Sequence, residues 1–264
     1  MIEKEIELFQ LENRAFHQVL VPSQDTIKFN YFLEANLIGQ NNTLMMGPTG
    51  IGKSLLGKEM IFKNMKPCTD SYLMGALNFS HITTSQYAQQ QFEMRLERRR
   101  KGVYGPSQDF KFIFFVDDLM MPMQDPYGVH LSNELMRQWF DYQGWYDLRT
   151  LDFKKVEDIQ FLCAITLRDS TKNLLGKRVA RHFTALGLNQ DQDQVLESIF
   201  KTLLEFISMQ WPSESHQFTE MLIKASIGFY QSLTQQFKPS PAKPHYVFNL
   251  RDIFRVFYFM HLAH

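Results

Sequence analysis

The stretch that decides the fold class is Gly47-Pro48-Thr49-Gly50-Ile51-Gly52-Lys53-Ser54. It fits the pattern GxxxxGK followed by Ser or Thr, in which a loop with few side chains lets backbone N–H groups approach phosphates closely. In this pattern Lys53 neutralises the β- and γ-phosphates of a nucleotide, and the Ser54 hydroxyl is a ligand of Mg²⁺. A short apolar run, Leu44–Met46, precedes the loop, and a helical pattern over residues 53–64 follows it. The sequence therefore predicts a strand, a loop and a helix that together bind ATP or ADP with Mg²⁺.

A second element that fits nucleotide chemistry is the apolar run Phe112–Val116, which is followed directly by Asp117 and Asp118. Such a run is typical of a buried parallel strand, and carboxylates at its end are unfavourable near a core unless a cation or hydrogen bonds compensate them. We expect Asp117 to hold Mg²⁺, directly or through water, and Asp118 to orient or polarise the attacking water. Many ATPases have the longer Glu at the second position. The missing methylene leaves the base about 1 Å short, which predicts slow hydrolysis.

The rest of the chain divides into two regions. Leu131–Tyr142 has a helical pattern and Ile159–Ile165 is another strand candidate, so strands and helices alternate over residues 1–189. This alternation predicts an α/β domain with a parallel sheet flanked by helices. Residues 190–264 keep helical spacing throughout and predict a small all-helical domain. At the N-terminus, residues 2–20 predict an amphipathic helix that acts as a connector.

Composition narrows the class of protein. The chain has 264 residues, of which 44% are hydrophobic and 21% charged, and this balance is typical of a globular protein. Its 28 basic and 28 acidic residues cancel, so no global field attracts nucleic acid or an anionic membrane. The apolar runs are too short to span a membrane, the charged start does not fit a secretory signal, and two cysteines suit a reducing, cytoplasmic environment.

Three local features have a structural interpretation. We interpret the basic run Arg98–Lys101 as the solvated end of a long helix rather than a nucleic-acid site, because cations are favourable near a helix C-terminus. Trp139 and Trp145 are expected to be buried beside the sheet, and His182 is expected to pack in the core rather than bind a ligand.

Six phrases of the sequence, taken together, resemble the dynein heavy chain, and specifically its third AAA+ module in the axonemal branch. They are GPTGIGKS (47–54), LERRRKGVYGP (96–106), FVDDLMMP (115–122), LMRQWFDYQGWYD (135–147), RVARHF (178–183) and HYVFNLRDIFRVF (245–257). The resemblance implies a P-loop NTPase fold of the AAA+ type followed by a helical lid. It also implies an ATP-driven microtubule motor, built as a ring of six such modules on one very long polypeptide.

The resemblance further implies partners and a location. The partners are the neighbouring AAA+ modules of the ring, and, through the rest of the motor, dynein intermediate and light chains and microtubules. The location is the cytoskeleton, in the axoneme of a cilium or flagellum. This chain then acts as an ATP-binding module that supports or regulates movement, with slow hydrolysis of Mg-ATP.

Four further site residues follow from the resemblance. Asn173 matches the residue that senses the γ-phosphate or positions water, although the preceding stretch, residues 166–172, departs from the family's Gly- and Pro-rich pattern. Arg178 and Arg181 match the pair from which an arginine finger reaches a neighbouring module's nucleotide. Arg251 matches a second sensor, through which the lid closes onto the γ-phosphate.

Two alternatives stay open at this point. The first is a regulatory or structural module that binds nucleotide without significant hydrolysis, or a fragment of the motor that is inactive alone. The second is a free-standing P-loop kinase, which requires a second substrate pocket in place of an inter-module arginine finger. Arg178 and Arg181 count against the kinase.

Overall fold

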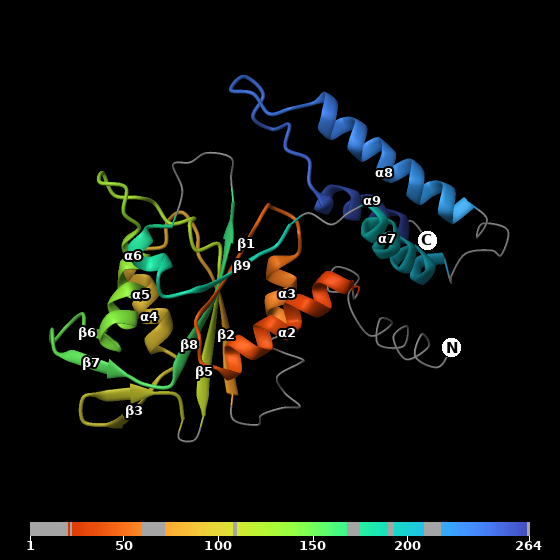
Figure 1. Cartoon of the computed structure of the whole chain (residues 1–264). Helices are drawn as coiled ribbons and strands as arrows, with labels where there is room; N and C mark the ends of the chain where they lie inside the picture. Colours follow the sequence, from red (N-terminus) through yellow and green to blue (C-terminus); the bar gives the residue numbers. More distant parts are fainter. Residues whose placement is uncertain are drawn as a thin grey trace. The chain divides into compact units, whose positions relative to one another are not determined.

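Five parallel strands form the central sheet of the protein, in the order β2-β5-β8-β1-β9 (Figure 1). The structure is a computed structural model, and it describes residues 21, 23–59, 72–107, 110–167, 175–189, 193–208 and 218–262. The strands are β1 (Thr43–Gly47), β2 (Tyr72–Asn78), β5 (Lys111–Asp117), β8 (Ile159–Thr166) and β9 (Thr184–Gly187).

Helices cover both faces of this sheet, as the alternating pattern predicts. In Figure 1, α2 (Gln24–Ile38) and α3 (Lys53–Glu59) lie on one face. The other face carries α4 (Ser85–Glu93), α5 (Leu131–Tyr142) and α6 (Lys177–Ala180). Because both faces are covered, β5 and β8 are buried along almost their whole length, which explains why they read as continuous apolar runs.

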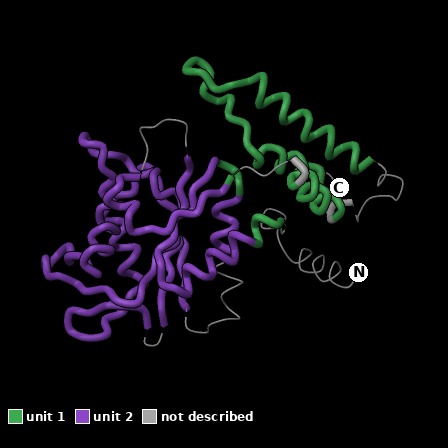
Figure 2. The backbone as a smooth tube through the Cα atoms, viewed as in Figure 1, with its two compact units in different colours: residues 1–27, 49–51, 189–264 green, residues 28–48, 52–188 purple. Residues whose placement is uncertain are grey.

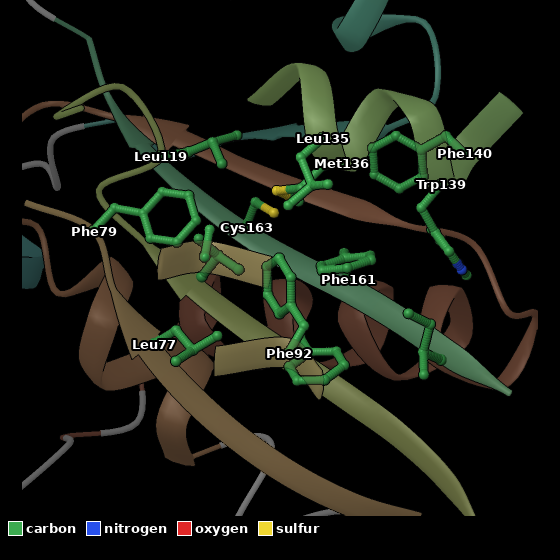
Figure 3. Close-up of a cluster of buried hydrophobic side chains, with 14 of the residues drawn as sticks. Leu77, Phe79, Phe92, Leu119, Leu135, Met136, Trp139, Phe140, Phe161 and Cys163 are labelled. Carbon is green, nitrogen blue, oxygen red and sulfur yellow. The ribbon is translucent and has the colours of Figure 1, made fainter. Parts of the chain in front are cut away.

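Aromatic side chains fill the core between the sheet and α4 and α5. Figure 3 shows Phe92, Trp139 and Phe140 gathered around Phe161, with ring centroids 5.4, 5.2 and 5.6 Å from its own. Trp145 is also fully buried and stacks on Phe92 at 5.9 Å. Burial of Trp139 and Trp145 beside the sheet is therefore confirmed.

A second, four-stranded sheet has the order β3-β4-β7-β6 and was not predicted. Its strands are β3 (Glu97–Arg100), β4 (Val103–Gly105), β6 (Gly144–Tyr146) and β7 (Phe153–Val156). The prediction that Arg98–Lys101 ends a long helix is wrong, because α4 stops at Glu93 and the run forms a hairpin. Arg99 explains the difference, since its guanidinium donates to Pro106 O at 2.9 Å and Phe110 O at 3.2 Å and pairs with Asp158.

A cluster of charged side chains ties the β6–β7 hairpin to α4. Lys154 Nζ donates to Glu93 Oε2 at 2.9 Å and pairs with Asp147. Glu93 Oε1 in turn accepts the indole N–H of Trp145 at 2.8 Å and a side-chain N–H of Gln89, also at 2.8 Å. Each polar group of this cluster is therefore hydrogen-bonded, which makes its partial burial tolerable.

We expect Asp147→Asn to destabilise the fold at neutral pH and to lose this effect in acid. Hydrogen bonds from Lys154 and from the backbone amides of Thr150 and Arg149 hold the pKa of Asp147 far below its ordinary value. A lowered pKa in the folded state means that the carboxylate stabilises the fold above its unfolded pKa of about 3.9, and that this stabilisation is lost as the pH falls towards the folded value. Urea unfolding of both proteins at pH 7, 5 and 3 measures the difference.

The control for this variant is Asp152→Asn, because Asp152 is exposed in the same hairpin. The stability difference between the parent and Asp147→Asn is expected to be equal at pH 7 and pH 5 and to shrink at pH 3. A difference that stayed constant down to pH 3 would contradict the assignment.

The regular elements among the described residues after 189 are helices, as predicted, apart from an isolated bridge between Ser240 and Lys243. They are α7 (Asp193–Ser208), α8 (Thr219–Gln236) and α9 (Leu250–Leu262). Their shared core includes Phe200, Leu204, Ile227 and Phe257. None of the helices within the described ranges is both long enough and apolar enough to cross a membrane.

The chain divides into two units (Figure 2). Unit 1 comprises residues 1–27, 49–51 and 189–264, and unit 2 comprises residues 28–48 and 52–188. The connector helix expected near the N-terminus falls on residues 2–20, which lie outside the described ones.

Candidate nucleotide site

The predicted phosphate loop begins where β1 ends, at Gly47. The backbone here is enclosed by the two neighbouring strands: Leu167 N donates to Gly47 O at 3.0 Å, and Leu188 N donates to Met46 O at 2.7 Å. A Cβ atom at Gly47 would stand 2.6 Å from Leu188 O. Only glycine therefore fits this position without moving the backbone of Leu188, the residue after β9.

Two further glycines allow the loop to turn back on itself. Gly50 has φ +85° and Gly52 has φ +93°, in the left-handed region that side chains disfavour. No described atom lies within 4 Å of where a Cβ on Gly52 would stand, so the loop is open on that side. The glycines of the motif therefore have the conformational role that the pattern predicts.

Lys53 lies inside the loop. The residue is 6% exposed, and its ammonium donates to Gly47 O at 2.9 Å and Pro48 O at 2.6 Å. A buried cation is unfavourable unless it is compensated, and here carbonyl oxygens provide part of the compensation. The loop thus surrounds a buried positive charge, which suits an anionic ligand.

The two carboxylates lie at the end of β5 and differ in their surroundings. Asp117 is 8% exposed, and its Oδ1 accepts the Asp118 N–H at 3.1 Å. Asp118 is exposed and has φ +54°. Among residues other than glycine, Asp and Asn are the ones most often found in this conformation. The turn itself therefore favours Asp over Glu at this position.

The strand order brings the loop and the carboxylates to one edge of the sheet. Because the strands are parallel, their carboxyl ends share an edge, and only β8 separates β1 from β5. Two strand spacings amount to about 10 Å. Ligands of open α/β sheets bind at this edge, where the strand order reverses. Gly47, Lys53, Ser54 and Asp117 all belong to unit 2.

The residues at this edge fit a magnesium ion. Ser54 and Asp117 supply hydroxyl and carboxylate oxygens, the donors that Mg²⁺ prefers. No group of three or more His, Cys, Asp or Glu side chains able to hold a metal occurs within the described residues. The donor set is therefore that of a magnesium ion held by few protein ligands together with phosphate oxygens.

The two arginines of the predicted finger pair are not equivalent. Arg181, at the end of α6, donates to Asp141 Oδ1 at 2.7 Å. Arg178 is exposed, and no hydrogen bond or ion pair of its side chain occurs in the described part of the chain. His182 is partly buried and stacks on Phe140 at 5.2 Å, in keeping with the expected packing role. Sequence reasoning missed Asp141, although its spacing of four residues from Arg137 on a helix is a recognisable signal.

The remaining predicted residues stay untested. Asn173 lies outside the described residues. Arg251 lies in the first turn of α9, where its backbone amide donates to Asn249 Oδ1 at 2.9 Å. Asn249 N donates in return to Asp252 Oδ2 at 2.9 Å, which fixes the start of the helix. Arg251 belongs to unit 1 and the rest of the site largely to unit 2.

These features define a P-loop nucleotide-binding module: a parallel α/β sheet with a glycine-rich loop after β1 and acidic residues after β5, followed by a helical domain. Residues 10–190 match the family model described as the P-loop containing dynein motor region, and residues 222–263 match the AAA+ lid domain. The chain belongs to the dynein motor family, which confirms the resemblance to that family.

Similar proteins are axonemal dynein heavy chains. Human dynein axonemal heavy chain 1 is 36% identical over 258 residues, which cover 93% of this chain and 6% of the relative. Human dynein axonemal heavy chain 6 is 35% identical over 238 residues, covering 90% and 6%. Mouse dynein axonemal heavy chain 2 is 32% identical over 245 residues, covering 93% and 5%. The chain thus spans about 5–6% of the length of these relatives.

Proposed function

We propose that this chain is an ATP-binding AAA+ module of a dynein heavy chain, and that it binds Mg-ATP and Mg-ADP and hydrolyses ATP slowly. The observation that carries the proposal is the buried ammonium of Lys53, enclosed by the glycine-rich loop. Buried Asp117 lies at the same edge of the sheet. A buried cation and a carboxylate that can hold a metal ion, both at one edge of the sheet, suit a magnesium-bound phosphate chain.

Each residue of the site has a proposed role. Backbone amides of residues 47–54 bind phosphate oxygens, and Lys53 neutralises their charge. Ser54 and Asp117 would hold Mg²⁺, which when bound offsets the negative charge of the phosphates. Asp118 orients the attacking water and accepts its proton, Asn173 positions that water or senses the γ-phosphate, and Arg251 lets the lid respond to it.

The family and the relatives support a wider role. We propose that the module occupies the third place in a ring of six, with residues 1–189 and 190–264 as its α/β and lid domains. Its partners are the neighbouring modules and, through the rest of the motor, intermediate and light chains and microtubules. The axonemal names of the relatives support a location in the cytoskeleton of cilia, where the module supports or regulates movement. Membership of this family argues against a free-standing kinase.

Isothermal titration calorimetry of the folded chain with ATP and with ADP, each with and without Mg²⁺, tests the proposed function. Circular dichroism establishes that the sample is folded. We expect binding of both nucleotides, tighter with Mg²⁺ because the metal compensates the charge of the phosphates beside Asp117. A folded sample that releases no heat with either nucleotide would refute the proposed function.

We expect Asp118→Asn to leave ATP affinity within about twofold and to slow hydrolysis about 100-fold, the lower end of what a general base contributes. Asn has the same shape as Asp and tolerates the left-handed backbone, so the turn is preserved. Single-turnover hydrolysis of radiolabelled ATP measures the rate. An unchanged rate would show that Asp118 is not the base, and a parent protein that binds ATP without cleaving it would favour the regulatory alternative.

A further inference from the structure

A cluster of charged side chains lies at the last turn of α5, outside the phosphate loop. Its centre is Asp141, whose side chain is 19% exposed. Asp141 accepts hydrogen bonds from Arg137 at 2.5 Å and from Arg181 at 2.7 Å. His182 Nε2 lies 3.1 Å from the same carboxylate. Every member of this cluster belongs to unit 2.

The carboxylate of Asp141 is held in its charged form. Its partial burial raises the pKa, but the hydrogen bonds from Arg181 and Arg137 outweigh this effect and leave the pKa below its ordinary value. At neutral pH, Asp141 is therefore a stable anion that attracts Arg181.

Aromatic packing holds the same segment against α5. Phe140 stacks on His182 with 23° between the ring planes, and the Phe183 ring lies edge-on to Phe140 at 5.0 Å. Arg181 is 61% exposed, so its ion pair alone is a weak tether. Ion pair and aromatic contacts together fix the residues that follow α6, and they direct the Arg181 guanidinium back onto α5.

Arg178 differs from Arg181 in its contacts, although both arginines are exposed. Arg178 lies within α6, three residues before Arg181, which directly follows the helix. Within the described residues no acidic side chain pairs with Arg178. An arginine finger contributes by meeting charge in the transition state. An arginine that no carboxylate binds can reach a phosphate on another module without first breaking an ion pair.

We propose that Asp141 is a positioning residue, which binds Arg181 and so leaves Arg178 as the arginine that reaches the neighbouring module's nucleotide. This assignment rests on the proposed function, because it requires a neighbouring AAA+ module. It gives the two arginines different tasks: Arg181 fixes α6 to α5 through Asp141, and Arg178 meets the phosphate.

The test uses the whole heavy chain with one active site. The phosphate-loop lysine is replaced by alanine in every module except the neighbour that faces α6, and single-turnover ATP hydrolysis is measured there. We expect Arg178→Ala to slow this hydrolysis about 1000-fold. Asp141→Asn and Arg181→Gln are each expected to slow this hydrolysis about tenfold. The double variant is expected to slow it by the same factor, because both substitutions break the same contact, that between Asp141 and Arg181.

A further comparison separates positioning from a merely structural role. In the Arg178→Ala background, Asp141→Asn is expected to cause no further loss, because Asp141 acts through Arg178. Arg149→Ala, at an exposed arginine of the same unit, is the control and is expected to leave the rate unchanged.

Three results would overturn the assignment: a larger loss for Arg181→Gln than for Arg178→Ala, a further loss from Asp141→Asn without Arg178, or no hydrolysis by the neighbour in the parent. The proposed function is tested separately, by calorimetric titration of nucleotide into the chain in which Lys53 is not replaced. Nucleotide binding there, together with a neighbour insensitive to Arg178, would refute only the present assignment.

Discussion

Lys53→Ala is expected to weaken binding of Mg-ATP about 100- to 1000-fold. Lys53 is 6% exposed and its ammonium lies inside the loop, and truncation of one partner of a buried, hydrogen-bonded charge pair costs about 2–5 kcal/mol. At about 1.4 kcal/mol per tenfold change, the expected loss corresponds to about 2.8–4.2 kcal/mol, the middle of this range. Calorimetric titration of the parent and the variant measures it directly.

Two further variants make this result specific to the site. Lys53→Met keeps the length of the side chain and removes its charge, so it is expected to lose as much affinity as Lys53→Ala while preserving more of the packing. Lys58→Ala changes a lysine of the same helix beyond the loop and is expected to bind normally. Retention of parental affinity by folded Lys53→Ala would show that the loop does not bind the nucleotide.

Phe161→Ala is expected to lower the free energy of unfolding by about 3–5 kcal/mol, the usual cost of truncating a buried Phe. Phe161 is fully buried in β8 at the centre of the aromatic cluster (Figure 3). Four rings lie within 5.6 Å of its own, those of Phe92, Phe114, Trp139 and Phe140. The cavity left by the ring cannot close without moving both the sheet and α5. Urea unfolding, followed by circular dichroism and tryptophan fluorescence, measures the change.

Tyr127→Ala is the matched control, because Tyr127 is 90% exposed in the loop before α5. It is expected to change the free energy of unfolding by less than about 0.5 kcal/mol. Equal losses for the two variants would contradict the position of Phe161 at the centre of the core.

Much of the α/β unit could be predicted because its signals are local. α5 has the predicted bounds, Leu131–Tyr142, and β8 extends the predicted strand by one residue, to Thr166. Each element has the same surroundings along its whole length, one face buried for α5 and both faces buried for β8. The order of apolar residues in the sequence therefore indicates the element directly. The phosphate loop was equally readable, since its glycines are required by backbone conformation at Gly50 and Gly52.

The second sheet could not be predicted, because its strands are short and polar and gain their stability from distant partners. Arg98–Lys101 follows a helix and carries charges that suit a helix end, so local propensity favours the wrong element. In the structure, Arg99 instead bonds to the backbone of Pro106 and Phe110 and to Asp158, 59 residues away. Such contacts leave no periodic trace in the sequence.

By itself, the sequence determined the class of this protein, because phosphate binding demands glycines, a lysine and a hydroxyl at fixed spacing within eight consecutive residues. Only the tertiary structure decided which carboxylates and cations meet. Asp117 reaches the loop's edge of the sheet through the strand order, and Asp141 binds Arg181 while Arg178 stays exposed. Electrostatic contacts depend on distances of a few ångströms between side chains far apart in the chain, and such distances exist only once the chain has folded.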